Sequence, residues 1–294
     1  MADHPRFGPA GMPTGFKLLK QPVTGVPKYL RDEGLDSFEY QMVRWGPKPQ
    51  IRQEMAEQLG KNAVEHDVWL TAHGSYFINL TSANKETLEA SKKRLLACVT
   101  GANWMGAHIV VFHPGAYSKR PPKQVFETCA KAMEEIVQAM LSLGITKVHL
   151  APEMMGKQAQ FGTVEEVCDL CERVDLTEPN VDWAHLHARG HGQFKSVDDV
   201  RKVMDTIEKR LGTNALKNLH CHYSHIEFTD KGERRHHNLD RTEYGPDFKL
   251  LAELIAERQL NPVVACETPN LDADAVKLRD MVQAEIKART KRRK

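Results

Sequence analysis

The feature that most constrains the fold is an alternation of short apolar runs with longer amphipathic stretches along the whole chain. The longer stretches have helical periodicity, with Asn84 and Ser196 as predicted N-caps and Gly144 and Gly212 as predicted helix ends. The short runs are rich in β-branched residues and predict strands at 7–11, 38–43, 68–73, 108–114, 147–153, 181–187, 219–227 and 262–267. Eight strand–helix pairs without a long polar linker predict a single α/β domain, a (β/α)8 barrel of parallel strands. The first strand is the weakest, because FGPAG contains glycine and proline. An open doubly wound sheet is the alternative, but the sequence has no GxGxxG or phosphate-binding loop to accompany it.

The chain has 294 residues, of which 41% are hydrophobic and 27% charged, as in ordinary soluble globular proteins. No apolar run approaches the roughly 20 residues of a membrane helix. The N-terminal sequence MADHPRFGPAGMP lacks the apolar stretch of a secretory signal. We therefore expect a cytoplasmic protein with no membrane partner. The barrel is expected over residues 1–285, followed by a flexible basic tail at 286–294.

The cysteines and the net charge constrain function little. Six cysteines follow no disulfide or zinc-finger spacing. Cys168 and Cys171 form a CxxC inside a helical pattern rather than at a helix start, so all six are expected to be reduced thiols. A total of 41 basic and 39 acidic residues gives a net charge of +2. This neither supports nor excludes a nucleic-acid partner, because a balanced total can hide a local basic groove.

Side chains that can bind metals stand at the carboxyl ends of most predicted strands from the third onward. In a (β/α)8 barrel, that face carries the active site. The residues are His73, His113, Glu153, Asp182, His185, His222 and Glu267, with His236 and His237 in the loop after the seventh strand. A lone histidine is more often a packing or surface residue, which is the expectation for His4, His66, His108, His149 and His191. For the strand-end set, the coincidence on six elements favours a common site.

The chemistry of these side chains indicates a centre with more than one metal ion. Buried carboxylates such as Glu153 and Glu267 are costly without a paired cation or a metal. Mixed histidine and carboxylate ligands suit zinc, with manganese or iron as substitutes. Eight or more candidates exceed the needs of one tetrahedral ion, so two or three ions are expected. Such clusters are typical of phosphodiester hydrolysis.

At these residues the sequence resembles the endonuclease IV family of abasic-site endonucleases. The matching blocks occur in the family's order over nearly the whole chain. They are HGSYFINL (73–80), FHPGAY (112–117), PEMMGKQAQFG (152–162), VDWAH (181–185), HYSHIE (222–227), RRHHNL (234–239) and CETPN (266–270). Any one block alone is a weak signal, whereas the set is specific.

The resemblance implies a role for each candidate ligand. It assigns His73 and His113 to a first zinc, with Glu153 bridging to a second, and it assigns His185 and His236 to a third. The second zinc would be completed by Asp182, His222 and Glu267. In place of the family's third-zinc aspartate, this chain has Arg234. Glu233 is the alternative ligand, the third site could be weak or absent, and Arg234 could contact phosphate or lie on the surface.

The resemblance also implies the reaction and the partner. The expected reaction is metal-assisted hydrolysis on the 5′ side of an abasic site in double-stranded DNA, with Glu153 and Glu267 as catalytic residues. Tyr76 would press into the DNA near the lesion, with Arg44 helping. A monomer is expected. The identity of the metals and any activity on blocked 3′ ends or oxidised bases stay open.

Three other functions are alternatives for a chain of this kind. A sugar isomerase or epimerase on the same barrel also gathers Glu, Asp and His at strand ends, usually around one or two ions. An amidohydrolase would place an HxH on its first strand, whereas the HxH pairs here, His185 with His187 and His220 with His222, come late. A non-catalytic DNA- or metal-binding module is the third. His220 is expected to face the same side as His222, either supporting the site or as a mere strand neighbour.

Overall fold

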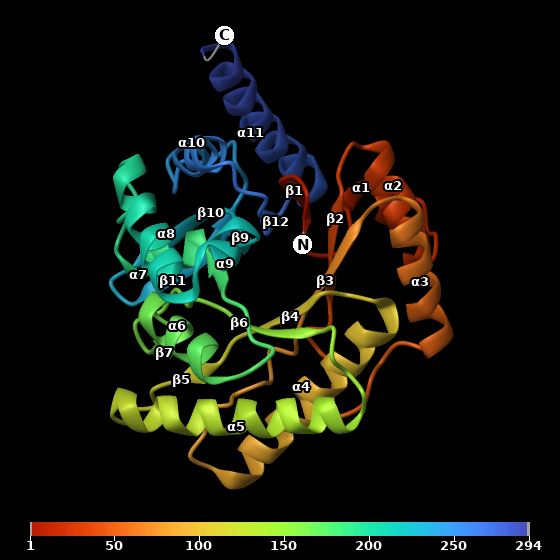
Figure 1. Cartoon of the computed structure of the whole chain (residues 1–294), viewed down its shortest axis with the longest axis vertical. Coiled ribbons are helices and arrows are strands. Elements are labelled where there is room, and N and C mark those ends of the chain that lie inside the picture. The colour runs from red at the N-terminus through yellow and green to blue at the C-terminus, as the bar shows by residue number, and fades with distance from the viewer. Residues whose placement is uncertain (1, 293–294) are drawn as a thin grey trace.

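The structure, a computed structural model, describes residues 2–292. Within them, eight parallel strands occupy the centre and helices surround them (Figure 1). The central strands are β1 (Arg6–Pro9), β2 (Ser37–Gln41), β3 (Trp69–His73), β4 (Ile109–Phe112), β6 (His149–Pro152), β8 (Asn180–Asp182), β9 (His220–Tyr223) and β12 (Val263–Cys266). Two short antiparallel pairs lie outside the barrel: β5 (Gly115–Ala116) with β7 (Gln160–Phe161), and β10 (His225–Thr229) with β11 (Gly232–His237).

Three of the four predicted capping residues cap helices, and Gly144 lies one residue beyond Leu143, the C-cap of the helix that ends at Ser142. The side chain of Asn84 accepts a hydrogen bond from the backbone of Thr87, Ser196 forms a capping box with Asp199, and Gly212 follows the last residue of its helix. Among residues 2–292, no helix combines the length and the apolar character needed to cross a membrane. The helices are α1 (Thr14–Leu18), the 3-10 helix η1 (Val23–Gly25), α2 (Val26–Asp32), α3 (Gln53–Glu65), α4 (Lys85–Met105), α5 (Pro122–Ser142), α6 (Val164–Arg173), α7 (Trp183–Arg189), α8 (Val197–Leu211), α9 (Thr213–Lys217), α10 (Phe248–Arg258) and α11 (Asp272–Arg292).

The strands pair in the order of a closed barrel. Two parallel sheets have the orders β1-β12-β9-β8 and β2-β3-β4-β6. Parallel bridges between Ala10 and Glu39 and between Glu153 and Asn180 join the two sheets at both seams. The predicted (β/α)8 barrel is therefore confirmed. Because every central strand runs the same way, all their carboxyl ends meet at one face.

Burial explains why the central strands read as continuous apolar runs. All four residues of β4 and all four of β12 are buried. In a parallel barrel, one strand face packs inward and the other packs on the helices, so neither face tolerates exposed polar groups. Buried polar residues in these strands, such as Glu39, therefore need a specific partner inside the barrel.

Three predicted strands were wrong in extent. The run at 181–187 is not a strand throughout: β8 ends at Asp182, and residues 183–189 form α7. The reason is local, because the side chain of Asp182 accepts a hydrogen bond from the backbone N–H of His185 and so caps the helix. The run at 219–227 divides into β9, which stays in the barrel, and β10, which leaves it to pair with β11. The first strand spans residues 6–9 rather than 7–11.

The C-terminal segment continues the last helix. The predicted domain boundary at residue 285 falls inside α11, and residues 286–292 of the predicted flexible tail are helical. The remaining two residues of that tail lie outside the described part of the chain. The end of α11 extends beyond the body of the barrel (Figure 1). The basic residues Arg289, Lys291 and Arg292 in its last turn are favourably placed at the negative end of the helix dipole.

Candidate metal centre

Three side chains at the ends of β3, β4 and β6 converge on one carboxylate oxygen. Oε2 of Glu153 lies 3.4 Å from Nε2 of His73 and 3.1 Å from Nε2 of His113. Although both nitrogens approach it, this buried oxygen accepts no hydrogen bond. Two imidazole nitrogens and a carboxylate oxygen within 4.8 Å of one another form a ligand set that suits zinc. We refer to His73, His113 and Glu153 as the first group.

A second group shares Glu153 with the first. It consists of Glu153, Asp182, His222 and Glu267, whose ligand atoms also lie within 4.8 Å of one another. Nδ1 of His222 is 3.2 Å from Oε1 of Glu153 and 3.3 Å from Oε1 of Glu267. Asp182 uses Oδ1 to cap α7, and its Oδ2 is buried without a hydrogen-bond partner. The two groups are adjacent because the two oxygens of Glu153 face one group each.

A third cluster forms between α7 and the β10–β11 hairpin. Nε2 of His185 lies 3.1 Å from Oε2 of Glu233, another buried oxygen that accepts no hydrogen bond. The ring of His236 is 5.5 Å from the ring of His185, centroid to centroid. Nδ1 of His236 lies 2.7 Å from the hydroxyl of Ser224. His185, Glu233 and His236 are therefore neighbours at the edge of the first two groups.

A β-bulge explains how Glu233 reaches this cluster. In the hairpin, Phe228 pairs with Glu233 and Glu227 pairs with Arg235, so Arg234 is the extra residue of the bulge. Residues three apart in a regular strand face opposite sides, whereas the bulge brings Glu233 and His236 to the same side. Arg234 points away: 65% of its side chain is exposed, and it forms a 2.6 Å ion pair with Glu227. The hairpin residue whose carboxylate faces His185 is therefore Glu233 and not a residue at position 234.

The charges of the cluster are strongly coupled. Burial raises the pKa of Glu267 to about 8, and the carboxylates of Asp182 and Glu153 act in the same direction. At Glu153 burial also raises the pKa, but His222 and His113 outweigh it and hold the pKa well below its usual range. The carboxylates thus repel one another, and cations nearby stabilise their ionised forms. A bound divalent cation would supply that stabilisation to all of them.

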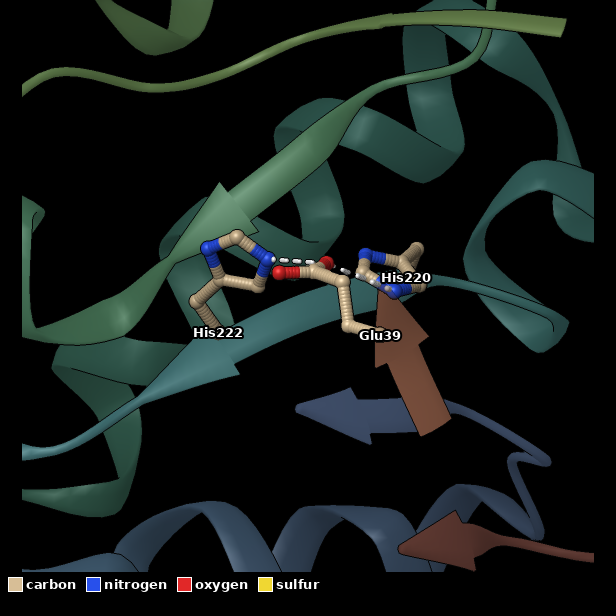
Figure 2. A group of neighbouring side chains, drawn as sticks. All are labelled: Glu39, His220 and His222. Carbon is tan, nitrogen blue, oxygen red and sulfur yellow. Dashed lines mark hydrogen bonds and ion pairs between the residues drawn. The ribbon is translucent and has the colours of Figure 1, made fainter. Parts of the chain in front are cut away.

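The structure adds a carboxylate that the sequence reasoning missed. Glu39, in β2, is buried, and its Oε2 lies 2.8 Å from Nε2 of His222 (Figure 2). Burial raises its pKa, but the attraction of His222 dominates and lowers it to about 2. His220 stands on the other side of Glu39 (Figure 2). Its Nδ1 lies 2.7 Å from Oδ1 of Asn180. A glutamate in the middle of a predicted barrel strand was the available signal.

The predicted DNA-contacting residues lie at the rim of the centre. Tyr76 stacks on His113 at 5.5 Å between ring centroids, and the residue is 58% exposed. Its backbone N–H donates to the carbonyl of Val43, which places it beside the turn that carries the exposed Arg44. Phe77, which the sequence reasoning did not single out, is 61% exposed next to it. The ring of Tyr76 thus flanks the first group, whereas the guanidinium of Arg94 lies over the ring of Phe77.

The comparisons with known proteins fit this geometry. A family model described as a xylose isomerase-like TIM barrel matches residues 27–288. The chain belongs to this family. The family match agrees with the barrel.

Several individual proteins resemble this xylose isomerase-like barrel over most of its length. An uncharacterised Methanocaldococcus jannaschii protein, MJ0133, is 30% identical, covering 92% of this chain and 94% of its own. A Listeria monocytogenes protein named "Probable endonuclease 4" is 28% identical, covering 92% and 89%. The crystal structure of endonuclease IV from Thermus thermophilus has a TM-score of 0.66 at 20% identity, covering 89% and 94%. A D-tagatose 3-epimerase-like protein also has a TM-score of 0.66, at 17% identity, covering 91% and 94%. The predicted resemblance to endonuclease IV is confirmed, and the likeness to the solved structures confirms the fold.

Proposed function

We propose that this protein is a metal-dependent DNA repair endonuclease that hydrolyses the phosphodiester on the 5′ side of abasic sites. The products are a 3′-hydroxyl and a 5′-deoxyribose phosphate. The observation that carries the proposal is the sharing of Glu153 by two adjacent ligand groups. Centres with two neighbouring ions are typical of phosphodiester hydrolysis. The relatives named "Probable endonuclease 4" support the same reaction.

The donor set fits zinc, with manganese or iron as substitutes. Buried oxygens of Glu153, Asp182 and Glu233 have no hydrogen-bond partner, which is costly unless a cation completes them. The first ion would be held by His73, His113 and Glu153. The second would be held by Glu153, Asp182, His222 and Glu267. A third would be held by His185, Glu233 and His236.

The residues of the centre divide the work of hydrolysis. When bound, the ions lower the pKa of water and stabilise the charge that develops on the phosphate. Glu153 fixes the position of the first group relative to the second, because its Oε2 faces the first group and its Oε1 faces the second. Glu267 has 19% of its side chain exposed, against 1% for Glu153 and none for His222. It is therefore the carboxylate of the second group that can orient an attacking water and accept its proton.

The rim fits a nucleic-acid substrate. Tyr76 presents an exposed ring beside the first group, the exposed Phe77 follows it in the chain, and aromatic rings of this kind stack on bases. Arg44, exposed in the neighbouring turn, is available to a phosphate. Extruding an abasic nucleotide is cheap because it has no base to unpair. We take the active unit to be a monomer, because one chain supplies the whole centre.

The test is cleavage of a labelled duplex that carries one tetrahydrofuran abasic analogue. The analogue cannot undergo β-elimination, so a cut with a 3′-hydroxyl immediately 5′ of it has to be hydrolytic. Zinc-loaded protein is expected to cut this duplex and to leave an intact duplex whole. Glu153→Gln is expected to abolish the cut. Glu178→Gln, which changes a carboxylate paired with His149 at the other end of the barrel, is the matched control. Failure of folded, metal-loaded protein to cut the duplex contradicts the proposal.

A sugar epimerase is the second candidate, and one observation favours it. The second group alone is a complete four-ligand site for a single ion, and epimerase structures share the fold. The first group and the exposed aromatic rim are then left without a purpose. Incubation with ketohexoses followed by chromatography of the sugars would detect this activity directly.

A further inference from the structure

Glu39 is a buried carboxylate to which the metal centre proposed above gives no role. It lies in β2, and its side chain is wholly inaccessible. Gln41, two residues along the same strand and on the same face, donates a 2.9 Å hydrogen bond to Oε1. The backbone at Glu39 is bridged to Ala10 where β1 meets β2. The carboxylate is therefore fixed in place, with Oε2 free to face the barrel interior.

The contacts of Oε2 distinguish a hydrogen bond from a shared metal ion. Oε2 lies 2.8 Å from Nε2 of His222 and 3.8 Å from Nε2 of His220 (Figure 2). Ligands of one tetrahedral zinc, each at 2.0–2.2 Å from it, stand about 3.4 Å apart. A separation of 2.8 Å is instead an ordinary hydrogen bond. Glu39 thus accepts a hydrogen bond from Nε2–H of His222, while His220 is too far away to donate.

This hydrogen bond determines which nitrogen of His222 can bind a metal. A neutral imidazole carries one N–H, so a proton held on Nε2 leaves the lone pair on Nδ1. Nδ1 is the atom that faces the oxygens of Glu153 and Glu267, at 3.2 and 3.3 Å. Without a metal, Nδ1 lies within hydrogen-bond distance of Oε1 of Glu153, and with a cation bound between these groups its lone pair would face the ion instead. The ring is therefore oriented for coordination through Nδ1, with its other nitrogen anchored on Glu39.

We propose that Glu39 is a positioning residue that sets the tautomer and orientation of His222 as a ligand of the second group. The inference rests on the metal-binding part of the proposed function and not on DNA cleavage. A carboxylate behind a ligating histidine raises the basicity of the ligand, and its loss typically costs about 10–100-fold in metal affinity. The donor strength of His222, and with it the second ion, depends on a strand that is not its neighbour, because β12 and β1 stand between β9 and β2.

The experiment compares zinc binding by the full chain and its variants, using a competing chromophoric chelator and metal analysis of the dialysed protein. Glu39→Leu removes the acceptor and is expected to weaken the ion of the second group by about 10–100-fold. Glu39→Gln keeps an acceptor oxygen without the charge and is expected to fall between Leu and wild type. Asp36→Asn is the matched control. Asp36 is a buried carboxylate just before β2, with Phe7 and His4 as partners, and its variant is expected to bind zinc as the wild type does.

A second measurement separates positioning from general damage to the fold. Nitrogen-15 spectra of the histidine rings in the zinc-loaded protein are expected to show the proton of His222 on Nε2. In Glu39→Gln the tautomer is expected to stay and the affinity to fall. In Glu39→Leu, Nε2–H is expected to exchange faster with water.

Three results would overturn the inference. The first is wild-type zinc affinity in both Glu39 variants. The second is that the Glu39 variants lose one ion completely while the ions of the groups described above bind as in the wild type. Glu39 and His220 would then be ligands of a separate ion. The third is a His222 proton on Nδ1. None of these readouts uses DNA, so failure to cut an abasic duplex leaves the inference standing, whereas a wild-type protein that binds no ion in the second group removes both.

Discussion

The two ends of the barrel carry similar residues and use them differently. In β9, His220 lies nearer the amino end and His222 nearer the carboxyl end. His108 precedes β4 and His113 follows it. β6 begins with His149 and is followed by Glu153. At the amino ends, His108 stacks on Trp69 with ring centroids 3.4 Å apart, and His149 pairs with Glu178 at 2.5 Å. These residues line a cavity of about 370 Å³. At the carboxyl ends, the histidines surround carboxylates.

The difference lies in the carboxylates rather than in the histidines. At the amino ends, the single carboxylate among the described residues that line the cavity, Glu178, has a histidine partner. At the carboxyl ends, Glu153, Asp182 and Glu233 each keep a buried oxygen without a hydrogen bond. Burying such an oxygen without a hydrogen bond is costly unless a cation compensates it. Histidine content therefore identifies neither end as a metal site, whereas only the carboxyl ends bring several such carboxylates together around the same histidines.

The sharpest test of this comparison changes one carboxylate at each end. Glu153→Gln is expected to reduce cleavage of an abasic duplex by about 10³-fold or more, because it disturbs both ligand groups. Glu178→Gln is expected to leave the rate within about twofold, because an ion pair at the far end touches no reacting group. Rate constants under single-turnover conditions give the measurement. Equal losses in the two variants would remove the distinction between the ends.

The hairpin offers a test within the active face. Glu233→Gln is expected to lower the rate by about 10–100-fold and to release one ion, because Glu233 contacts His185. The neighbouring Arg234→Ala is expected to change little, because an exposed ion pair contributes at most about 1 kcal/mol. Metal analysis and rates should be taken on the same preparations. A larger effect at Arg234 than at Glu233 would reverse the assignment made from the bulge.

Removal of metal should destabilise the protein through the carboxyl-end clusters. Zinc at about 1,000 times its dissociation constant stabilises the folded state by about 4 kcal/mol. For a domain of this size, chelation is then expected to lower Tm by roughly 8–16 °C. The decrease in Tm on chelation should be smaller in Glu153→Gln than in the wild type, and it should be unchanged in Glu178→Gln. Scanning calorimetry with and without chelator measures it, and identical shifts in both variants would contradict the assignment.

The smallest expected effect is a pH dependence that arises at the amino ends. Burial lowers the pKa of His108 from 6.5 to about 4, so the folded protein holds this ring neutral. Between these values the unfolded chain binds more protons, and stability therefore falls as the pH decreases from 6.5 towards 4. Replacing His108 by Phe, which keeps a ring against Trp69, should reduce this loss by roughly 2–3 kcal/mol at pH 4.5. Urea unfolding across this pH range is the measurement, and parallel curves for the two proteins would contradict it.

The sequence was sufficient for the barrel and for the positions of most candidate ligands. Hydrophobic runs mark strands that are buried on both faces, and parallel topology then brings their ends together. The end of β8 was not predictable from the hydrophobic pattern, because VDWAHLH is apolar enough for a strand and the change to helix depends on capping by Asp182. Glu39 was missed because its partner His222 is far away in the sequence and on another strand. The choice between Glu233 and Arg234 needed the pairing register of the hairpin, which the sequence does not state.

The bulge at Arg234 gives this hairpin an unusual tolerance to a change in length. In an ordinary strand, deleting one residue moves all later side chains to the opposite face. Here the deletion of Arg234 would turn Glu-Arg-Arg-His into Glu-Arg-His, and regular alternation would still place the glutamate and the histidine on the same side. The three-residue and four-residue spacings are therefore interchangeable solutions for one site. A search for related proteins that demands a fixed interval between these two ligands would discard chains built like this one.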